Sequence, residues 1–227
     1  MKTRTVLSAV STLALLLMAP AFAQKFEVVH AVDYDDWEQA KRAMDTLMED
    51  DALTGARVTL YSQEFGQKVA SHLIVEDFDS YADYTEVTQK RLASHGWSRY
   101  QLHSMDSEYM GSDLIMVADD HGAPRHTAGY LVAYLIKASD PALYRSAIAD
   151  LNKGVGNPGV LRLVAMRTGN MAYTHAVLIG GPDFETVQTY IDKLYASDAF
   201  AEFVAKVGDS RQVMGINTYY RVATYGD

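Results

Sequence analysis

The sequence predicts an α+β protein built from two tandem βαββαβ repeats whose sheets pack against each other within one chain. Three observations indicate this fold. Strand-like and helix-like segments follow the same order in both halves. A turn glycine followed by a strand with a central histidine occurs at Gly66–Val75 and again at Gly169–Leu178. The two copies keep a constant offset of 103 residues as far as Ser94 and Ser197, which favours an internal duplication over two unrelated halves of the same order.

The first residues have the layout of a secretory signal peptide. Lys2 and Arg4 supply positive charge, Val6 to Met18 is apolar, and Ala21-Phe22-Ala23 provides a small-x-small cleavage site. We therefore assign residues 1–23 to a signal peptide and expect the mature protein to be exported to the periplasm. The apolar run is shorter than the about 20 residues that span a bilayer, so we expect no membrane span in the mature chain.

The first repeat, residues 24–118, begins with a β-rich run and an amphipathic helix. Asp35 and Asp36 are the N-cap candidates, and Gln39 follows Asp36 by three residues, as in a capping box. The repeat ends with a broken second helix and a last strand. Its expected elements are strands at Phe26–Val32, Val58–Ser62, Val69–Val75 and Leu114–Ala118, helices over Trp37–Met48 and from Asp77 or Asp79 onward, and a short helical piece at Trp97–Leu102.

Residues 119–127 form a polar stretch with Gly and Pro and without periodicity, which predicts a linker. The second repeat, residues 128–227, then follows the same order. Asp140-Pro141 is a strong helix start, because Pro suits the first helical position. Its expected strands are Tyr130–Ile136, Val160–Arg167, Met171–Ile179 and Gly215–Tyr225, with helices after Asp140, after Asp183 and after Ser197.

A βαββαβ unit is a ferredoxin-like motif, and its helices cover one face of a four-stranded sheet. Two units in one chain can bury their bare faces against each other as an intrachain α/β barrel. This organisation resembles the dimeric α/β-barrel superfamily, including its antibiotic-biosynthesis-monooxygenase-like, NIPSNAP-like and chlorite-dismutase-like families. The most specific local similarity is the broken helix at Lys193–Phe203, with a counterpart at Lys90–Trp97. The resemblance implies a pocket between sheet and helices or inside the barrel, which holds haem, a polyketide-like substrate or no known ligand.

His72 and His175 occupy equivalent strand positions in the two repeats. The faces opposite them carry small apolar residues, as a helix-covered face should, so strand alternation predicts that both histidines point into the space between the sheets. The functional interpretation is a ligand contact, a proton shuttle or a metal or haem ligand. The alternative is a pair of buried histidines bonded to backbone or tyrosine hydroxyls.

Tyrosines are frequent on the strands of the second repeat, and Tyr134 and Tyr173 are candidates for an aromatic pocket. Ordinary strand propensity is the alternative explanation. The candidate ligand-binding residues are thus His72, His175, Tyr173 and Tyr134, with no catalytic set and no metal site assigned. Arg162 and Arg167 lie an odd number of residues apart, so they do not form one anion clamp. For them and for Arg57 we expect a protective role on edge strands.

Composition narrows the function classes. The formal net charge is −9, which argues against nucleic-acid binding. There are no cysteines, which excludes thiolate catalysis, iron–sulfur clusters and Cys-type zinc sites. We expect an exported barrel that binds a small molecule between or beside its sheets, as a monomer or a homo-oligomer. The alternatives are a cofactor-independent or haem-dependent oxidoreductase and a structural or interaction module without a small-molecule site.

Overall fold

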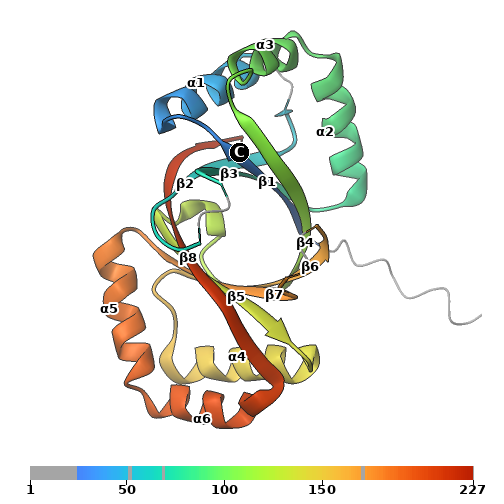
Figure 1. The fold of residues 1–227 in the computed structure, drawn as a ribbon. Coiled ribbons are helices and arrows are strands. Elements are labelled where there is room, and N and C mark those ends of the chain that lie inside the picture. The colour runs from blue at the N-terminus through green and yellow to red at the C-terminus, as the bar shows by residue number, and fades with distance from the viewer. Residues whose placement is uncertain (1–24, 51–52, 68–69, 170–171, 227) are drawn as a thin grey trace, which may run out of the picture.

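The computed structural model describes residues 25–50, 53–67, 70–169 and 172–226. It is an α+β protein with one closed eight-stranded antiparallel β-barrel between two groups of helices (Figure 1), which confirms the predicted fold class. The predicted signal peptide, residues 1–23, lies outside the described residues. Among the described helices, none combines the length and apolar character that crossing a bilayer requires.

Each half of the barrel is a four-stranded unit with three α-helices. The first half consists of β1 (Phe26–Asp33), α1 (Trp37–Met48), β2 (Arg57–Gln63), β3 (His72–Phe78), α2 (Tyr81–Ala93), α3 (His95–His103) and β4 (Glu108–Gly122). A short 3₁₀ helix, η2 (Arg125–Thr127), connects the halves. The second half consists of β5 (Tyr130–Ala138), α4 (Pro141–Val155), β6 (Val160–Thr168), β7 (His175–Gly181), α5 (Phe184–Tyr195), α6 (Asp198–Val207), the 3₁₀ helix η3 (Gly208–Ser210) and β8 (Arg211–Tyr225).

The last strand of each half closes the barrel. The strand order is β1-β3-β2-β8-β5-β7-β6-β4, and β4 returns to β1. β4 and β8 are each 15 residues long, and each pairs with the first strand of its own half and with a strand of the other half. Because β2 and β6 have a hydrogen-bonded neighbour on both sides, the predicted edge-protecting role of Arg57, Arg162 and Arg167 is wrong.

Part of the stretch predicted as a linker is strand. Asp119 to Gly122 continue β4 and pair with the first residues of β6. The sequence shows no alternation of apolar residues here, because side chains of this strand form ion pairs and do not pack in an apolar core. Asp120, for example, pairs in register with Arg162 and forms an ion pair with it at 2.7 Å.

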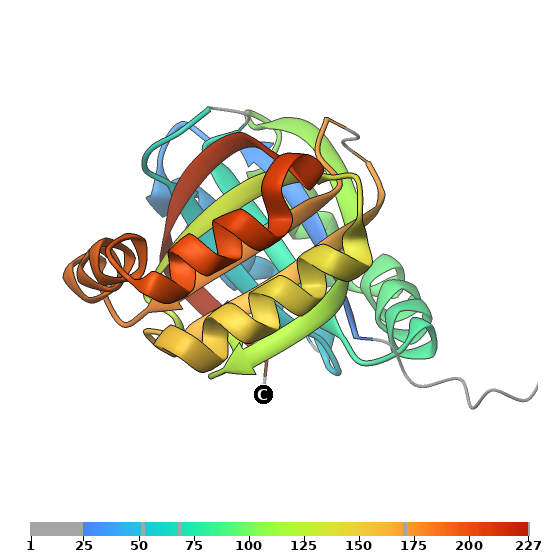
Figure 2. The same ribbon diagram turned by 90° about the horizontal axis from the view of Figure 1, so that it is seen from below.

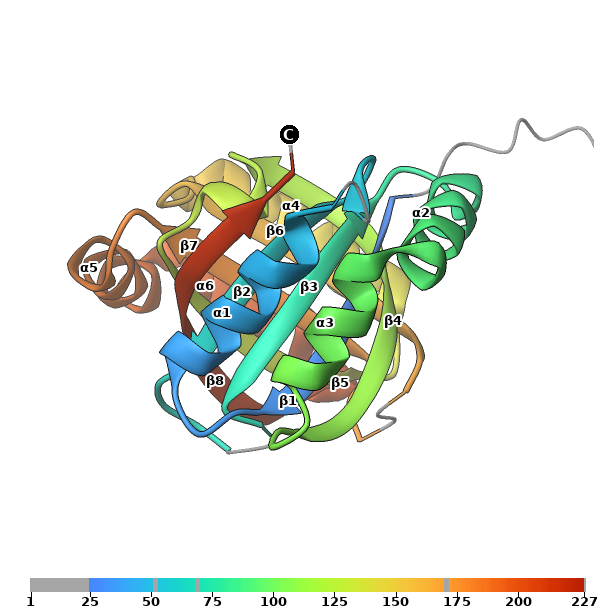
Figure 3. The same cartoon turned by 90° about the horizontal axis from the view of Figure 1, so that it is seen from above.

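The helices cover the outer faces of the barrel. α1 and α3 lie side by side over the first-half strands (Figure 3), and α4 and α6 lie over the second-half strands (Figure 2). Side-chain caps fix where these helices begin. Asp36, one of the two candidate caps of α1, accepts a hydrogen bond from the Gln39 backbone N–H at 2.6 Å. Asp140 accepts one from the Leu143 backbone N–H at 3.0 Å, which confirms the cap predicted there.

The buried apolar residues in the described part of the chain form three cores, one under each helix layer and one inside the barrel. On β3, Leu73 and Val75 belong to the barrel core, whereas Ile74 belongs to the core under α1. The neighbouring His72 therefore faces the helix side, as does His175 on β7. The prediction that both histidines point between the sheets is wrong. An eight-stranded barrel has an interior only wide enough for packed side chains, so the faces with the small residues turn inward.

A buried cluster of charges links the two halves at one end of the barrel. Arg125, of which 2% is exposed, donates from Nε to Glu27 Oε1 at 2.9 Å and from Nη2 to Asp77 Oδ2 at 2.7 Å. Arg162 contacts Glu27 through Nη1 and Asp120 through Nη2. The cluster therefore ties β1, β3, β4 and β6 to the segment that connects the halves.

The acids in this cluster have opposite pKa shifts. Burial raises the pKa of Glu27, but Arg125 and Arg162 lower it by more, to about 2. Burial and the nearby charge of Glu27 raise the pKa of Asp77 to about 6, against the opposing effect of Arg125. Glu27 therefore carries the cluster's most strongly held negative charge.

Replacing Glu27 should destabilise the fold strongly. In Glu27→Gln, two buried guanidinium groups lose a shared anionic partner, so we expect a loss of about 3–5 kcal/mol in the free energy of unfolding, measured by urea denaturation. Asp150→Asn is the control, because Asp150 pairs only with exposed lysines. Its stability should change far less than that of Glu27→Gln, because exposed ion pairs contribute little. A similar small loss in both variants would contradict a stabilising role for the cluster.

The same shifts predict how stability depends on pH. The folded pKa of Glu27, about 2, lies below its ordinary value of 4.5. Its contribution is therefore present above about pH 4.5 and is lost as the pH falls towards 2. The raised pKa of Asp77 acts in the opposite sense, so stability declines as the pH rises from about 4 to about 6. Urea denaturation across pH should show that Asp77→Asn abolishes this second decline, and an unchanged pH profile would refute the assignment.

Candidate functional site

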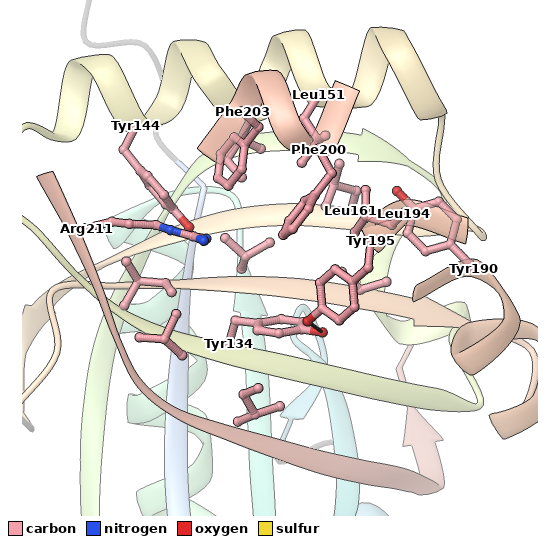
Figure 4. Close-up of a pocket in the computed structure, with 16 residues that line it drawn as sticks. Tyr134, Tyr144, Leu151, Leu161, Tyr190, Leu194, Tyr195, Phe200, Phe203 and Arg211 are labelled. Carbon is pink, nitrogen blue, oxygen red and sulfur yellow. Dashed lines mark hydrogen bonds between the residues drawn. The ribbon is translucent and has the colours of Figure 1, made fainter. Parts of the chain in front are cut away.

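Among the described residues, two pockets lie between the sheets and the helices, one in each half. The second-half pocket (Figure 4) is enclosed by the second-half strands and by α4, α5 and α6, and its cavity measures about 120 Å³. The first-half pocket lies under α1, α2 and α3 and is larger, at about 490 Å³. A third cavity, of about 90 Å³, remains inside the packed barrel. Of these three cavities, the first-half pocket offers the most space for a ligand.

The second-half pocket is almost wholly apolar. Its walls come from the four second-half strands and from α4, α5 and α6. The residues that line it are Tyr134, Ile136, Tyr144, Ile148, Leu151, Leu161, Val177, Ile179, Tyr190, Leu194, Tyr195, Phe200, Phe203, Val213 and Ile216, together with Arg211. Aromatic rings on several sides favour a ligand with a flat apolar body.

Two tyrosines meet at the mouth of this pocket. The hydroxyl groups of Tyr134 on β5 and Tyr195 on α5 lie 2.8 Å apart and form a hydrogen bond (Figure 4). Burial raises the pKa of Tyr134, and the hydrogen bond with Tyr195 raises it further. The Tyr134 hydroxyl is therefore neutral at ordinary pH. About half of Tyr195 is exposed, so this ring separates the cavity from solvent.

Arg211 is the only charged residue among the described residues that line the second-half pocket. Its guanidinium carbon lies 5.0 Å from the centre of the Phe203 ring, and Figure 4 shows the side chain extending towards Tyr144. Burial raises the pKa of Tyr144 to about 12, against the opposing effect of Arg211. No carboxylate in the described part of the chain forms an ion pair with Arg211. The pocket thus offers one cation without an anionic partner.

The structure does not bring the four predicted site residues together. His72 packs edge-on against Tyr34, with ring centres 5.7 Å apart, and its Nδ1 lies 2.8 Å from Ser71 Oγ. His175 has the matching contact with Thr174 and lies beside Tyr144. Neither histidine lines the first-half or the second-half pocket.

The electrostatic setting of both histidines is that of core residues. Burial lowers the pKa of His72 and of His175, so both rings are neutral at pH 7. Of the other two predicted residues, Tyr173 lines the small cavity inside the barrel, and Tyr134 lines the second-half pocket. Sequence reasoning missed Arg211, because a single arginine at the start of a strand belongs to no motif.

The side chains present do not fit a haem group. The second-half pocket has no histidine among the described residues that line it, and its volume is far below that of a macrocycle. In the first-half pocket, His30 Nε2 faces a buried carboxylate of Glu76 at 3.4 Å instead of an open coordination position. The described residues also contain no group of three or more His, Asp or Glu side chains placed to hold a metal ion.

Comparison with known proteins places the fold among α/β barrels. No protein-family model and no curated protein matches the sequence. A proposed monooxygenase from Fusobacterium nucleatum has a similar structure, with a TM-score of 0.57 and 11% identity over 89% of this chain and 94% of that one. An anthrone oxidase-like protein matches with a TM-score of 0.56 and 13% identity over 89% and 93%. A proposed chlorite dismutase matches at 0.53 and 13% over 88% and 96%.

These structures belong to the dimeric α/β-barrel superfamily that the sequence resembles. At such low identity the similarity establishes the fold and leaves the activity to be argued from the pockets. The protein is thus a ferredoxin-like α/β barrel of two similar halves, with a cavity beside the strands of each half.

Proposed function

We propose that the protein binds a small aromatic molecule with one acidic group in the second-half pocket. The observation that carries this proposal is Arg211, a cation without a carboxylate partner among the described residues, at the wall of an aromatic cavity. Arginine recognises carboxylates through paired, charge-assisted hydrogen bonds. The ring of the ligand would pack against Phe203 and Tyr144 while its acidic group meets Arg211.

The size of the cavity limits the ligand to about one ring. A cavity of about 150 Å³ in another protein accommodates benzene, and the 120 Å³ available here is comparable. A larger molecule would require Tyr195 to turn away from Tyr134 and open the mouth. The export signal predicted in residues 1–23 supports the further proposal that the protein meets this ligand in the periplasm.

Binding of benzoate tests the proposal. By isothermal titration calorimetry, benzoate should bind more tightly than benzyl alcohol, which has the same ring without the charge. Arg211→Gln should weaken benzoate binding by at least about tenfold, because a charge-assisted hydrogen bond contributes about 1.5–3 kcal/mol. The affinity for benzyl alcohol should change little.

Arg42→Gln is the matched control, since Arg42 forms an exposed ion pair with Glu38 on α1, far from the second-half pocket. It should leave benzoate binding unchanged. Equal affinity for the charged and uncharged ligands, or equal losses in both arginine variants, would remove the basis for a site at Arg211.

An oxidoreductase is the second candidate, because the structures of similar fold include proposed monooxygenases and an anthrone oxidase-like protein. If the protein only binds its ligand, we expect a mixture of protein and dithranol, a hydroxylated anthrone, to consume oxygen no faster than dithranol in protein-free buffer. Uptake that scales with protein concentration would favour the enzyme. A Soret band in protein purified from the periplasm would favour a haem-dependent one. Failure to bind any ligand would favour a purely structural role.

A further inference from the structure

A polar pocket of about 260 Å³ lies at the end of the barrel that holds the buried charges. Residues of β1, β2, β3, α2, β4, η2 and β6 enclose it, so both halves of the barrel contribute to its walls. Asp77, Asp120 and Arg162 of the buried cluster are part of its lining. Among the described residues, it shares no lining residue with the two pockets between the sheets and the helices. The polar pocket is therefore a separate candidate site.

Most charged side chains that line the polar pocket already have a partner. The ion pairs are Asp77 with Arg125 at 2.7 Å, Asp120 with Arg162 at 2.7 Å and Lys25 with Asp79 at 3.7 Å. Two charged lining residues, Arg57 and Asp83, form no ion pair with any described residue. Both are partly buried, so each has lost part of its hydration without gaining a partner of opposite charge.

Arg57 supplies positive charge on one wall of the polar pocket. It is paired directly opposite Asp77 between β2 and β3, so both side chains leave the sheet on the same face. Asp77, however, is occupied by Arg125. Burial lowers the pKa of His126 on the same wall, and the charges of Arg57 and of three other arginines lower it further, so His126 is neutral at pH 7. An anionic group placed here can pair with Arg57 without displacing an existing ion pair.

Asp83 lies on the other side of the end of β3. It belongs to the first turn of α2, which packs over β1 and β4. The Tyr81 ring at the start of α2 lies 4.9 Å from the Phe26 ring of β1, and its hydroxyl contacts Met116 of β4. In the strand order, β3 separates β1 from β2, which carries Arg57. A ligand that reaches both unpaired charges must therefore carry its own charges at two separate ends.

We propose that the polar pocket binds a small zwitterion with a carboxylate at one end and an ammonium group at the other, as in an ω-amino acid. The carboxylate would pair with Arg57 and the ammonium group with Asp83, each through charge-assisted hydrogen bonds. A ligand with only one of these charges would leave Arg57 or Asp83 without a partner. This site is separate from the one proposed at Arg211, and neither proposal depends on the other.

A matched series of ligands tests the need for both charges. The amino acids β-alanine, 4-aminobutyrate and 6-aminohexanoate increase the separation between the two charged groups. Each is compared, by isothermal titration calorimetry at pH 7, with the carboxylate and the amine of the same chain length. We expect at least one of the three amino acids to bind about tenfold or more tightly than both of its singly charged counterparts.

Variants then locate the binding site. Arg57→Gln and Asp83→Asn should each weaken binding of the best amino acid by about tenfold or more. Both substitutions leave the ion pairs of the buried cluster in place, and far-UV circular dichroism checks that the variants are folded. Arg167→Gln and Glu86→Gln are the matched controls. Arg167 is a strand arginine without an ion pair to any described residue, Glu86 is an exposed acid on α2, and neither lines the polar pocket.

Two results would overturn the proposal. One is that no amino acid of the series binds more tightly than its singly charged counterparts, which can be measured on the unaltered protein. The other is unchanged binding of the best amino acid in folded Arg57→Gln or folded Asp83→Asn. Benzoate binding that responds to Arg211→Gln can succeed while binding of the amino acids fails, so the two sites are judged separately.

Discussion

The rest of the structure depends on the buried ion pairs of Glu27 with Arg125 and Arg162. These ion pairs join the two halves of the barrel. Glu27 lies on β1 of the first half, Arg162 on β6 of the second half, and Arg125 on the segment between them. A barrel closed across halves needs β4 to stay paired with β6, and Arg162 and Asp120 form an ion pair across that seam. Such a network is costly to break, because each guanidinium would be left buried without its partner.

Closure of the barrel also decides where a ligand can bind. Eight strands enclose an interior that side chains fill, so the space between the sheets shrinks to about 90 Å³. The cavities between the sheets and the helices measure about 120 and 490 Å³. These two pockets lie beside the sheets, under α1 and α3 or under α4 and α6.

The two halves share one frame, and the side chains at equivalent positions around the two cavities differ. The first half places Glu76, Arg91 and His30 around its cavity, whereas the second half has Ile179, Leu194 and Tyr134 in their places. His72 and His175, which marked the repeat in the sequence, occupy equivalent positions in the two halves. Each packs in the core under its helix layer with a neighbouring hydroxyl on Nδ1, which agrees with the structural alternative that the sequence left open for both.

The order of elements, the caps at Asp36 and Asp140, and the duplication were determined by local sequence, because periodicity and capping depend on near neighbours. Local sequence did not determine which way the side chains of His72 and His175 point. Strand alternation assigns residues to two faces but does not say which face packs against the helices. The strand at Asp119–Gly122 was not predicted, because Asp120 forms its ion pair with Arg162, which is distant in sequence. Only the tertiary structure brought Arg91 to Glu76 and Arg211 to Tyr144, because these contacts join separate elements whose spacing in sequence carries no pattern.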